Sequence, residues 1–113
     1  MGSERRRSPR IDILGELHGH AILLDESVEI RQMSAGGITI VTKYPFKIQS
    51  FHDFQLSNGS DSQVVRGRVI HRRMLVEHDE TFYVLGIQLV DLSDKAMEWI
   101  NGFLAALPEP VRA

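Results

Sequence analysis

The highest density of charge in the chain lies in ERRRSPR at residues 4–10. Arg6 and Arg10 form an Arg-x-x-x-Arg pattern within it. Guanidinium groups are always charged, and their planar forks of donors match phosphate oxygens and the O6/N7 edge of guanine. Pro9 restricts Ser8 to extended backbone and stiffens the arm, which reduces the entropy lost on binding. The pattern predicts an anion site, whereas an arginine run taken alone is more often a basic tail.

A second polar segment, Gln32-Met33-Ser34-Ala35-Gly36-Gly37, joins two stretches with the alternation of β-strands. Its amide, hydroxyl and glycines would form a small polar ledge. The paired glycines admit backbone with positive φ and the close approach of a ligand. Taken alone, the segment predicts an ordinary turn, and most such turns bind nothing.

Catalytic and metal-binding signatures are missing from the sequence. It contains no nucleophile elbow, Walker loop or dinucleotide fingerprint, and its carboxylates scatter through predicted turns. His18 and His20 would share one face of a strand, but spacing supplies no third metal ligand. The absence of cysteine excludes disulfides, thiol catalysis and thiolate zinc sites. We therefore expect no catalytic residue and no metal, and a protein that is not an enzyme.

The elements that must position these residues are mainly β-strands. Of the 113 residues 42% are hydrophobic and 25% are charged, which fits one globular domain. Apolar residues alternate with a period near two until residue 92, and Ser93 then caps a helical pattern that Pro108 ends. This order predicts an antiparallel barrel or curled sheet packed by one helix. The predicted strands cover residues 11–24, 28–31, 38–42, 51–56, 64–73 and 81–92.

The charge is unevenly distributed along the chain. Residues 4–10 carry four of the thirteen basic and one of the fifteen acidic residues, a net +3, which leaves −5 for the remainder. A basic arm on an acidic domain favours a local anion site over a nucleic-acid surface. The predicted parts are a flexible basic arm (1–10), a barrel with its helix (11–107) and a tail (108–113). No apolar run reaches the ~20 residues of a membrane span, so we expect a cytoplasmic protein without membrane contact.

The order of the motifs resembles one known family. Arg6-x-x-x-Arg10, followed after about twenty residues by Gln32-x-Ser34-x-x-Gly37, is similar to the Arg-x-x-x-Arg and [Asp/Asn]-x-Ser-x-x-Gly motifs of the PilZ domain family. GRVI at residues 67–70 resembles the family's fifth-strand region. YVLGIQL at residues 83–89, followed by DLS at 91–93, resembles the strand before its C-terminal helix. The resemblance covers residues 4–107.

The resemblance implies a six-stranded antiparallel β-barrel with a C-terminal α-helix. It also implies a bacterial receptor for cyclic di-GMP, a second messenger that controls motility and biofilm formation. Arg6 and Arg10 would clamp phosphate and guanine, while Gln32, Ser34 and Gly37 would line a ledge on the barrel surface. No other cofactor is implied.

The residue before the first motif arginine influences stoichiometry in that family, and here it is Arg5. A basic residue at this position accompanies an intercalated ligand dimer, so the resemblance implies two nucleotides per domain. The ligand would order the arm against the barrel and change the surface that an effector protein reads. Binding would therefore couple to ordering of the arm.

Gln32 departs from the family pattern of Asp or Asn. A carboxylate can accept from both N–H groups of the guanine edge, whereas an amide offers one carbonyl oxygen, here one methylene further out. Losing one such contact costs ~1–3 kcal/mol, about one or two decades of affinity. The alternative is therefore a degenerate PilZ-like domain that binds no nucleotide and acts as a protein-interaction module.

Four further arginines follow one predicted strand, at positions 66, 68, 72 and 73. They form a candidate extension of the anion site, although such residues more often make a solvated strand face. Nucleic-acid binding through the basic arm is the weakest reading, because the rest of the chain is acidic and surface aromatics for base stacking are lacking.

Overall fold

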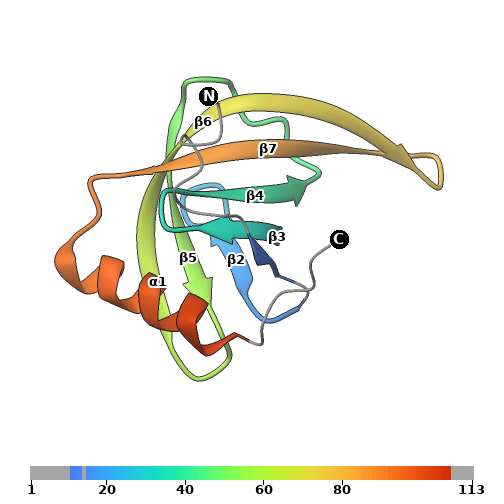
Figure 1. Cartoon of the computed structure of the whole chain (residues 1–113). Helices are drawn as coiled ribbons and strands as arrows, with labels where there is room; N and C mark the ends of the chain where they lie inside the picture. The colour runs from blue at the N-terminus through green and yellow to red at the C-terminus, as the bar shows by residue number, and fades with distance from the viewer. Residues whose placement is uncertain (1–10, 14, 108–113) are drawn as a thin grey trace, which may run out of the picture.

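The computed structural model describes residues 11–13 and 15–107, which form seven β-strands and one α-helix (Figure 1). The strands are mutually antiparallel, as the alternating pattern predicts. The predicted arm and tail lie outside the described residues, so their boundaries stay predictions. The elements are β1 (Ile11–Asp12), β2 (His18–Ala21), β3 (Glu26–Ser34), β4 (Gly37–Thr42), β5 (Phe51–Ser57), β6 (Ser62–Glu77), β7 (Glu80–Val90) and α1 (Asp94–Ala106).

Six of the strands close into a barrel. They follow the order β3-β2-β5-β6-β7-β4, and pairing of β3 with β4 completes the circle. This confirms the six-stranded barrel that the resemblance implies. The strand predicted over residues 11–24 is wrong as one element, because Gly15 takes a φ of +82° and separates β1 from β2. The two parts pair with successive stretches of the same edge of β3.

The barrel interior is filled by the inward residues of every barrel strand. Phe54, Leu56 and Met33 have no exposed surface. Phe46, which follows Pro45 in the connection between β4 and β5, is also fully buried. Its ring contacts His52 edge to face at 4.8 Å between centroids. The connection between β4 and β5 therefore closes over the core instead of running free in solvent.

β6 and β7 form a long hairpin that extends well past the barrel (Figure 1). Glu77 pairs with Glu80, so the turn consists of His78 and Asp79 alone, with φ values of +50° and +63°. The predicted strands 64–73 and 81–92 leave residues 74–80 between them as a longer loop, and this prediction is wrong. Two consecutive positive φ values match the right-handed twist of a two-residue hairpin, and aspartate and histidine accept this conformation more readily than most residues.

α1 covers one end of the barrel, away from the tip of the hairpin (Figure 1). The Ser93 hydroxyl accepts a hydrogen bond from the Ala96 amide at 3.0 Å, as expected of an N-cap. Ala96 and Ile100 pack into the barrel core. No helix in the described ranges is long and apolar enough to cross a bilayer.

Candidate functional site

Gln32 lies on the outer side of the barrel next to an irregularity in β3. Ile30 pairs with Ile40 and Gln32 with Thr39, so Arg31 is an extra residue opposite the β4 ladder. Ile30 and Met33 are buried, whereas Arg31 and Gln32 are both half-buried. The β-bulge therefore turns two consecutive polar side chains away from the core. The sequence pattern alone would have placed only one of them outside.

The start of the described chain lies directly beside Gln32. β1 pairs with β3 so that Asp12 is opposite Gln32 and Ile11 opposite Met33. The Nε2 atom of Gln32 donates to Oδ1 of Asp12 at 3.1 Å. A carboxylate thus accompanies the amide at the position where the family motif carries Asp or Asn.

Ser34 is the last residue of β3 and Gly37 is the first residue of β4, on either side of a tight turn. They pair across it, and the Ser34 Oγ lies 3.5 Å from the carbonyl oxygen of Gly37. Neither Gly36 nor Gly37 has a positive φ, so the backbone freedom that these glycines offer is not used. Gly37 is needed for space, because a Cβ atom there would lie 2.7 Å from the carbonyl oxygen of Ile87.

A groove of about 450 Å³ connects Gln32 with the β6–β7 hairpin. We call it the Gln32 groove. It combines polar side chains of both charges with an apolar wall from Leu75 and Val84. Its two basic groups suit an anion, and the apolar wall suits the face of a flat ring. The lining residues are Asp12, Arg31, Gln32, Thr39, Arg73, Leu75, Glu77 and Val84.

The rest of this outer face follows from strand register. Thr39 pairs with Gly86, and Gly86 pairs with His71. A Cβ atom on Gly86 would lie 2.3 Å from the His71 ring, so the imidazole covers the backbone at that point. The imidazole therefore adds a flat, exposed ring in the pairing row that begins at Gln32.

The four arginines of β6 have separate environments. Arg66 pairs with Asp53 at 3.1 Å, and Arg72 donates to the carbonyl oxygen of Phe46 at 3.1 Å. Arg68 donates to Gln88 at 3.2 Å, while its buried Nε has no partner within the described part of the chain. Of these four arginines of β6, only Arg73 lines the Gln32 groove. The predicted extension of the anion site therefore reduces to Arg73 at the groove itself, with Arg68 further along the face.

Arg5, Arg6 and Arg10 lie outside the described residues, so their predicted roles are not placed by the structure. Arg10 is nevertheless bonded to Ile11, and consecutive Cα atoms are about 3.8 Å apart. Because Ile11 pairs with Met33, the chain that carries the arginine motif enters the fold beside Gln32.

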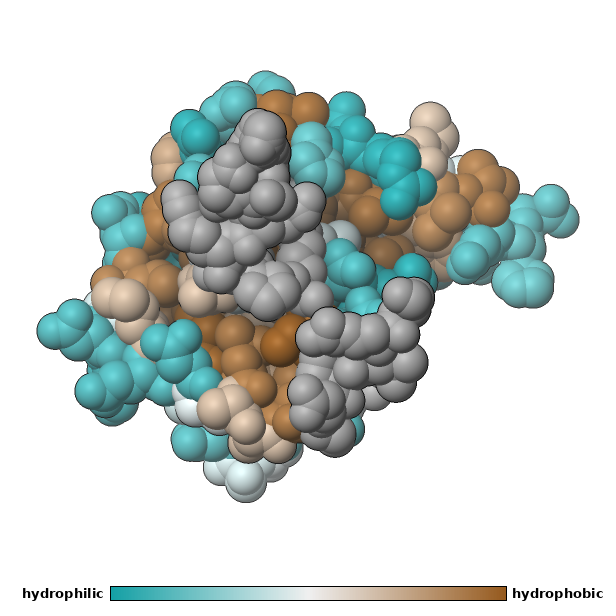
Figure 2. Space-filling view, viewed as in Figure 1, coloured by the Kyte–Doolittle hydropathy of each residue, from teal (hydrophilic) through white to brown (hydrophobic). Residues whose placement is uncertain are grey.

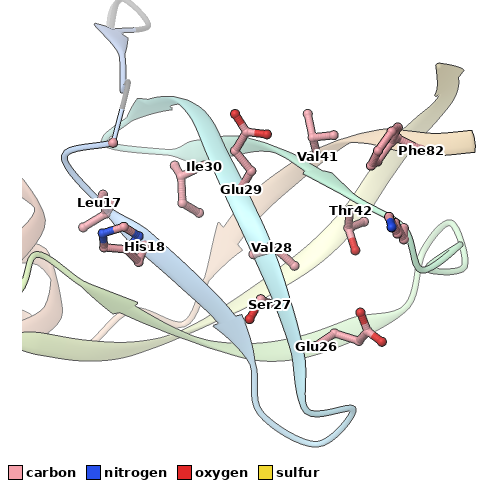
Figure 3. A pocket seen from close by; sticks show the side chains of 12 residues that line it. Leu17, His18, Glu26, Ser27, Val28, Glu29, Ile30, Val41, Thr42 and Phe82 are labelled. Atoms are coloured by element: carbon pink, nitrogen blue, oxygen red, sulfur yellow. The ribbon is translucent and has the colours of Figure 1, made fainter. Parts of the chain in front are cut away.

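A second groove of about 540 Å³ lies where β3 and β4 diverge (Figure 3). Its lining includes Val28, Thr42 and Phe82 together with the acidic residues Glu26 and Glu29. It contains one lysine and no arginine, so it suits an anion less well than the Gln32 groove. We therefore assign the candidate site to the Gln32 groove.

The two histidines of β2 have different surroundings. His18 is exposed at the second groove, while His20 contacts Asp25 at 3.0 Å. Within residues 11–13 and 15–107 there is no group of three or more histidine, cysteine, aspartate or glutamate residues that could hold an ion.

His52 has a pKa below the ordinary value of a histidine. Burial beneath the β4–β5 connection lowers the pKa of His52 from its ordinary value of 6.5, and the charge of Asp53 opposes this shift only in part. The His52 Nε2 atom lies 2.8 Å from the Ser50 hydroxyl. We assign this histidine to the stability of the fold, because it is not among the residues that line either groove.

Sequence reasoning missed Asp12, Arg31 and Thr39 as site residues. Asp12 reaches the site only through the pairing of β1 with β3, which joins segments twenty residues apart. Arg31 reaches it through the bulge. The alternation Ile11-Asp12-Ile13 was a signal that Asp12 faces outward, but it does not identify the neighbouring strand.

Comparisons with solved structures agree with the fold. The PilZ domain of YcgR from Escherichia coli with c-di-GMP matches with a TM-score of 0.71 and 14% identity, covering 91% of each chain. The MrkH–c-di-GMP complex of K. pneumonia gives a TM-score of 0.73 and 18% identity, covering 89% of this chain and 51% of that one. YcgR of E. coli in complex with c-di-GMP gives 0.73 and 14%, covering 90% and 45%. This chain thus spans about half of MrkH and of that longer YcgR chain.

A search among curated protein sequences found no match. A family model, in contrast, matches residues 4–106, which include both motifs and every element of the barrel. The motif order, the closed six-stranded barrel with its terminal helix and this match agree. The chain belongs to the PilZ domain family, whose members are ligand-binding receptor domains.

Proposed function

We propose that this protein is a receptor for cyclic di-GMP, which binds in the Gln32 groove and is clamped by Arg6 and Arg10. The observation that carries the proposal is the pairing of β1 with β3. This pairing places β1, whose first residue is bonded to Arg10, beside Gln32 in the neighbouring strand. Support also comes from the family and from the similar structures of the YcgR PilZ domain with c-di-GMP and of the MrkH–c-di-GMP complex.

The groove offers separate contacts for phosphate and base. Arg6 and Arg10 supply charge-assisted hydrogen bonds to the two phosphates, and Arg73 adds a cation from the opposite wall. Arg31 is less available, because its Nε donates to Glu29 at 3.1 Å. Leu75 and Val84 provide an apolar surface on which a purine can lie.

Asp12 compensates for the unusual glutamine. Gln32 donates to Asp12 through Nε2, which leaves its Oε1 as an acceptor for a guanine N–H group. The carboxylate of Asp12 is exposed and lines the same groove. It therefore offers the ionised acceptor that an Asp in place of Gln32 would have provided.

Arg5 leads us to propose two nucleotides per chain, stacked as an intercalated pair. The ligand would order the arm against β3 and β4 and so change the surface that an effector protein meets. Ordering the arm costs conformational entropy and so opposes binding, and the contacts to the phosphates offset this cost. No catalytic step is part of the proposal.

The test is isothermal titration calorimetry of cyclic di-GMP into the wild-type chain and single arginine variants. Each charge-assisted hydrogen bond contributes about 1.5–3 kcal/mol, so Arg6→Ala and Arg10→Ala should weaken binding by roughly tenfold or more. Arg7→Ala removes the same charge from the same arm but from outside the motif, and it should bind within a few fold of wild type. Equal loss in all three variants, or none in Arg6→Ala, would contradict the clamp.

The second candidate is a PilZ domain that has lost nucleotide binding and acts as a protein-interaction module. The observation that favours it is the glutamine at position 32, where the family motif has Asp or Asn. Salt distinguishes the candidates, because capture of a nucleotide by arginines weakens as ionic strength rises, whereas an apolar protein interface does not. A flat titration with folded wild-type protein would favour this second candidate.

A further inference from the structure

Among the described residues, nothing pairs with one edge of β6 in the projecting part of the β6–β7 hairpin. β5 pairs with β6 only as far as Arg68, and Ser50 and Gln49 then bond to Val69. The Arg72 guanidinium reaches the carbonyl oxygens of Pro45 and Phe46 at the start of the projecting part. From residue 73 to residue 77, no described residue pairs with this edge. Such an edge is a ready template for another strand.

The side chains along this edge are apolar in the middle and charged at both ends. Met74 is 62% exposed and Val76 is 63% exposed. Figure 2 shows hydrophobic surface extending out along the hairpin and giving way to hydrophilic atoms at its tip. A free strand with these residues exposed is a liability unless something covers it.

We propose that β6 pairs with β6 of a second copy of this chain, antiparallel and centred on Leu75. The sequence Arg73-Met74-Leu75-Val76-Glu77 is self-complementary in this register. Arg73 faces Glu77 of the other copy at both ends, Met74 faces Val76, and Leu75 faces itself. Because successive side chains of a strand point to opposite faces, the two ion pairs flank the Leu75 pair on one face of the sheet, and Met74 packs on Val76 of the other copy on the opposite face. Pairing about this twofold axis joins the two hairpins into a four-stranded sheet.

The hydrogen-bond pattern of the hairpin permits this register. Glu77 and Glu80 flank a two-residue turn and exchange hydrogen bonds with each other, so the backbone groups of Leu75 and Arg73 also point towards β7. Those of Met74 and Val76 then point to the free edge. A pairing centred on Leu75 places Met74 opposite Val76, so these outward groups meet their equivalents. Arg73 and Glu77 occupy the more closely spaced pairs, where side chains approach best.

Neighbouring registers are worse. Centring the axis on Met74 places Arg73 opposite Leu75, and centring it on Val76 places Leu75 opposite Glu77. Both leave a charge facing an apolar side chain. Shifts of a single residue break the hydrogen-bond pattern altogether. The short paired segment predicts a weak dimer that forms as protein concentration rises from micromolar towards millimolar.

The experiment is sedimentation velocity over that concentration range, without nucleotide. The wild-type chain should pass from monomer to dimer. Arg73→Glu and Glu77→Arg should each remove the dimer, because like charges then face each other twice. The double variant Arg73→Glu with Glu77→Arg restores opposite charges and should restore it. A monomer at every concentration, a dimer in either single variant, or no rescue in the double variant would overturn the proposal.

A backbone variant provides an independent check. Val76→Pro removes an outward N–H group without touching the bonds to β7, so it should abolish the dimer while circular dichroism stays that of the wild type. Thr81→Pro serves as the matched control, since Thr81 faces Val76 across the hairpin on β7, away from the proposed interface. A Val76→Pro protein that is folded and still dimeric would overturn the pairing.

Discussion

Replacing Gly37 by alanine should destabilise the barrel even though the backbone conformation at Gly37 is open to any residue. The added Cβ would lie 2.7 Å from the Ile87 carbonyl oxygen, closer than the 3.0 Å below which real Cβ contacts essentially never occur. The contact is with backbone, so no side chain can move aside. Because β4 is held between β3 and β7, relief requires β4 and β7 to separate at the point where Gly37 pairs with Gln88.

Overpacking of this kind costs typically ~1–3 kcal/mol, which for a domain of this size lowers Tm by roughly 5–20 °C. Urea denaturation followed by circular dichroism measures the free energy of unfolding. Gly36→Ala is the matched control, since a Cβ there meets nothing within 4 Å. Alanine restricts the unfolded chain more than glycine does. The Gly36→Ala protein should therefore be as stable as the wild type or more stable by ~0.4–1 kcal/mol. Equal midpoints for the two variants would refute the reasoning.

Three further changes test how the fold is stabilised. Arg72→Ala leaves the carbonyl of Phe46 without its 3.1 Å donor and should lower the free energy of unfolding by about 1–3 kcal/mol, measured in urea. His52 has a lowered pKa when folded, so the unfolded chain binds more protons and wild-type stability should fall as pH drops below 6.5; His52→Gln should flatten that loss in urea titrations across this range. Ser93→Ala removes the cap of α1 and should cost ~0.5–2 kcal/mol, whereas Ser93→Asp should retain it; equal stability of both would argue against the cap.

The sequence predicts the barrel well because its signals are local. Alternation of apolar residues identifies strands, and Ser93 with the following stripe identifies the only helix of the described chain. The two-residue turn at His78 and Asp79 was missed, because it lacks the glycine or asparagine that usually marks such turns. Burial of Phe46 was also missed, since it lies in a connection without periodicity.

The candidate site was predictable in part for the same reason. Gln32, Ser34 and Gly37 form one local motif that can be read from the sequence, although only Gln32 lines the groove. Asp12 could not, because its place depends on which strand β1 joins. The bulge at Arg31 also leaves no mark in the alternation of apolar residues. For Gly37, the sequence suggested backbone freedom, whereas the structure shows a lack of room for a side chain.

The central claim is that cyclic di-GMP occupies the Gln32 groove, and amide chemical-shift mapping by NMR tests it most directly. Titration into the ¹⁵N-labelled chain should shift the amides of Gln32, Thr39 and Gly37, while those of Val28 and Thr42 at the second groove stay in place. Saturation at two nucleotides per chain would also support the role of Arg5. Shifts confined to the second groove, or none at all in a folded protein, would contradict the account.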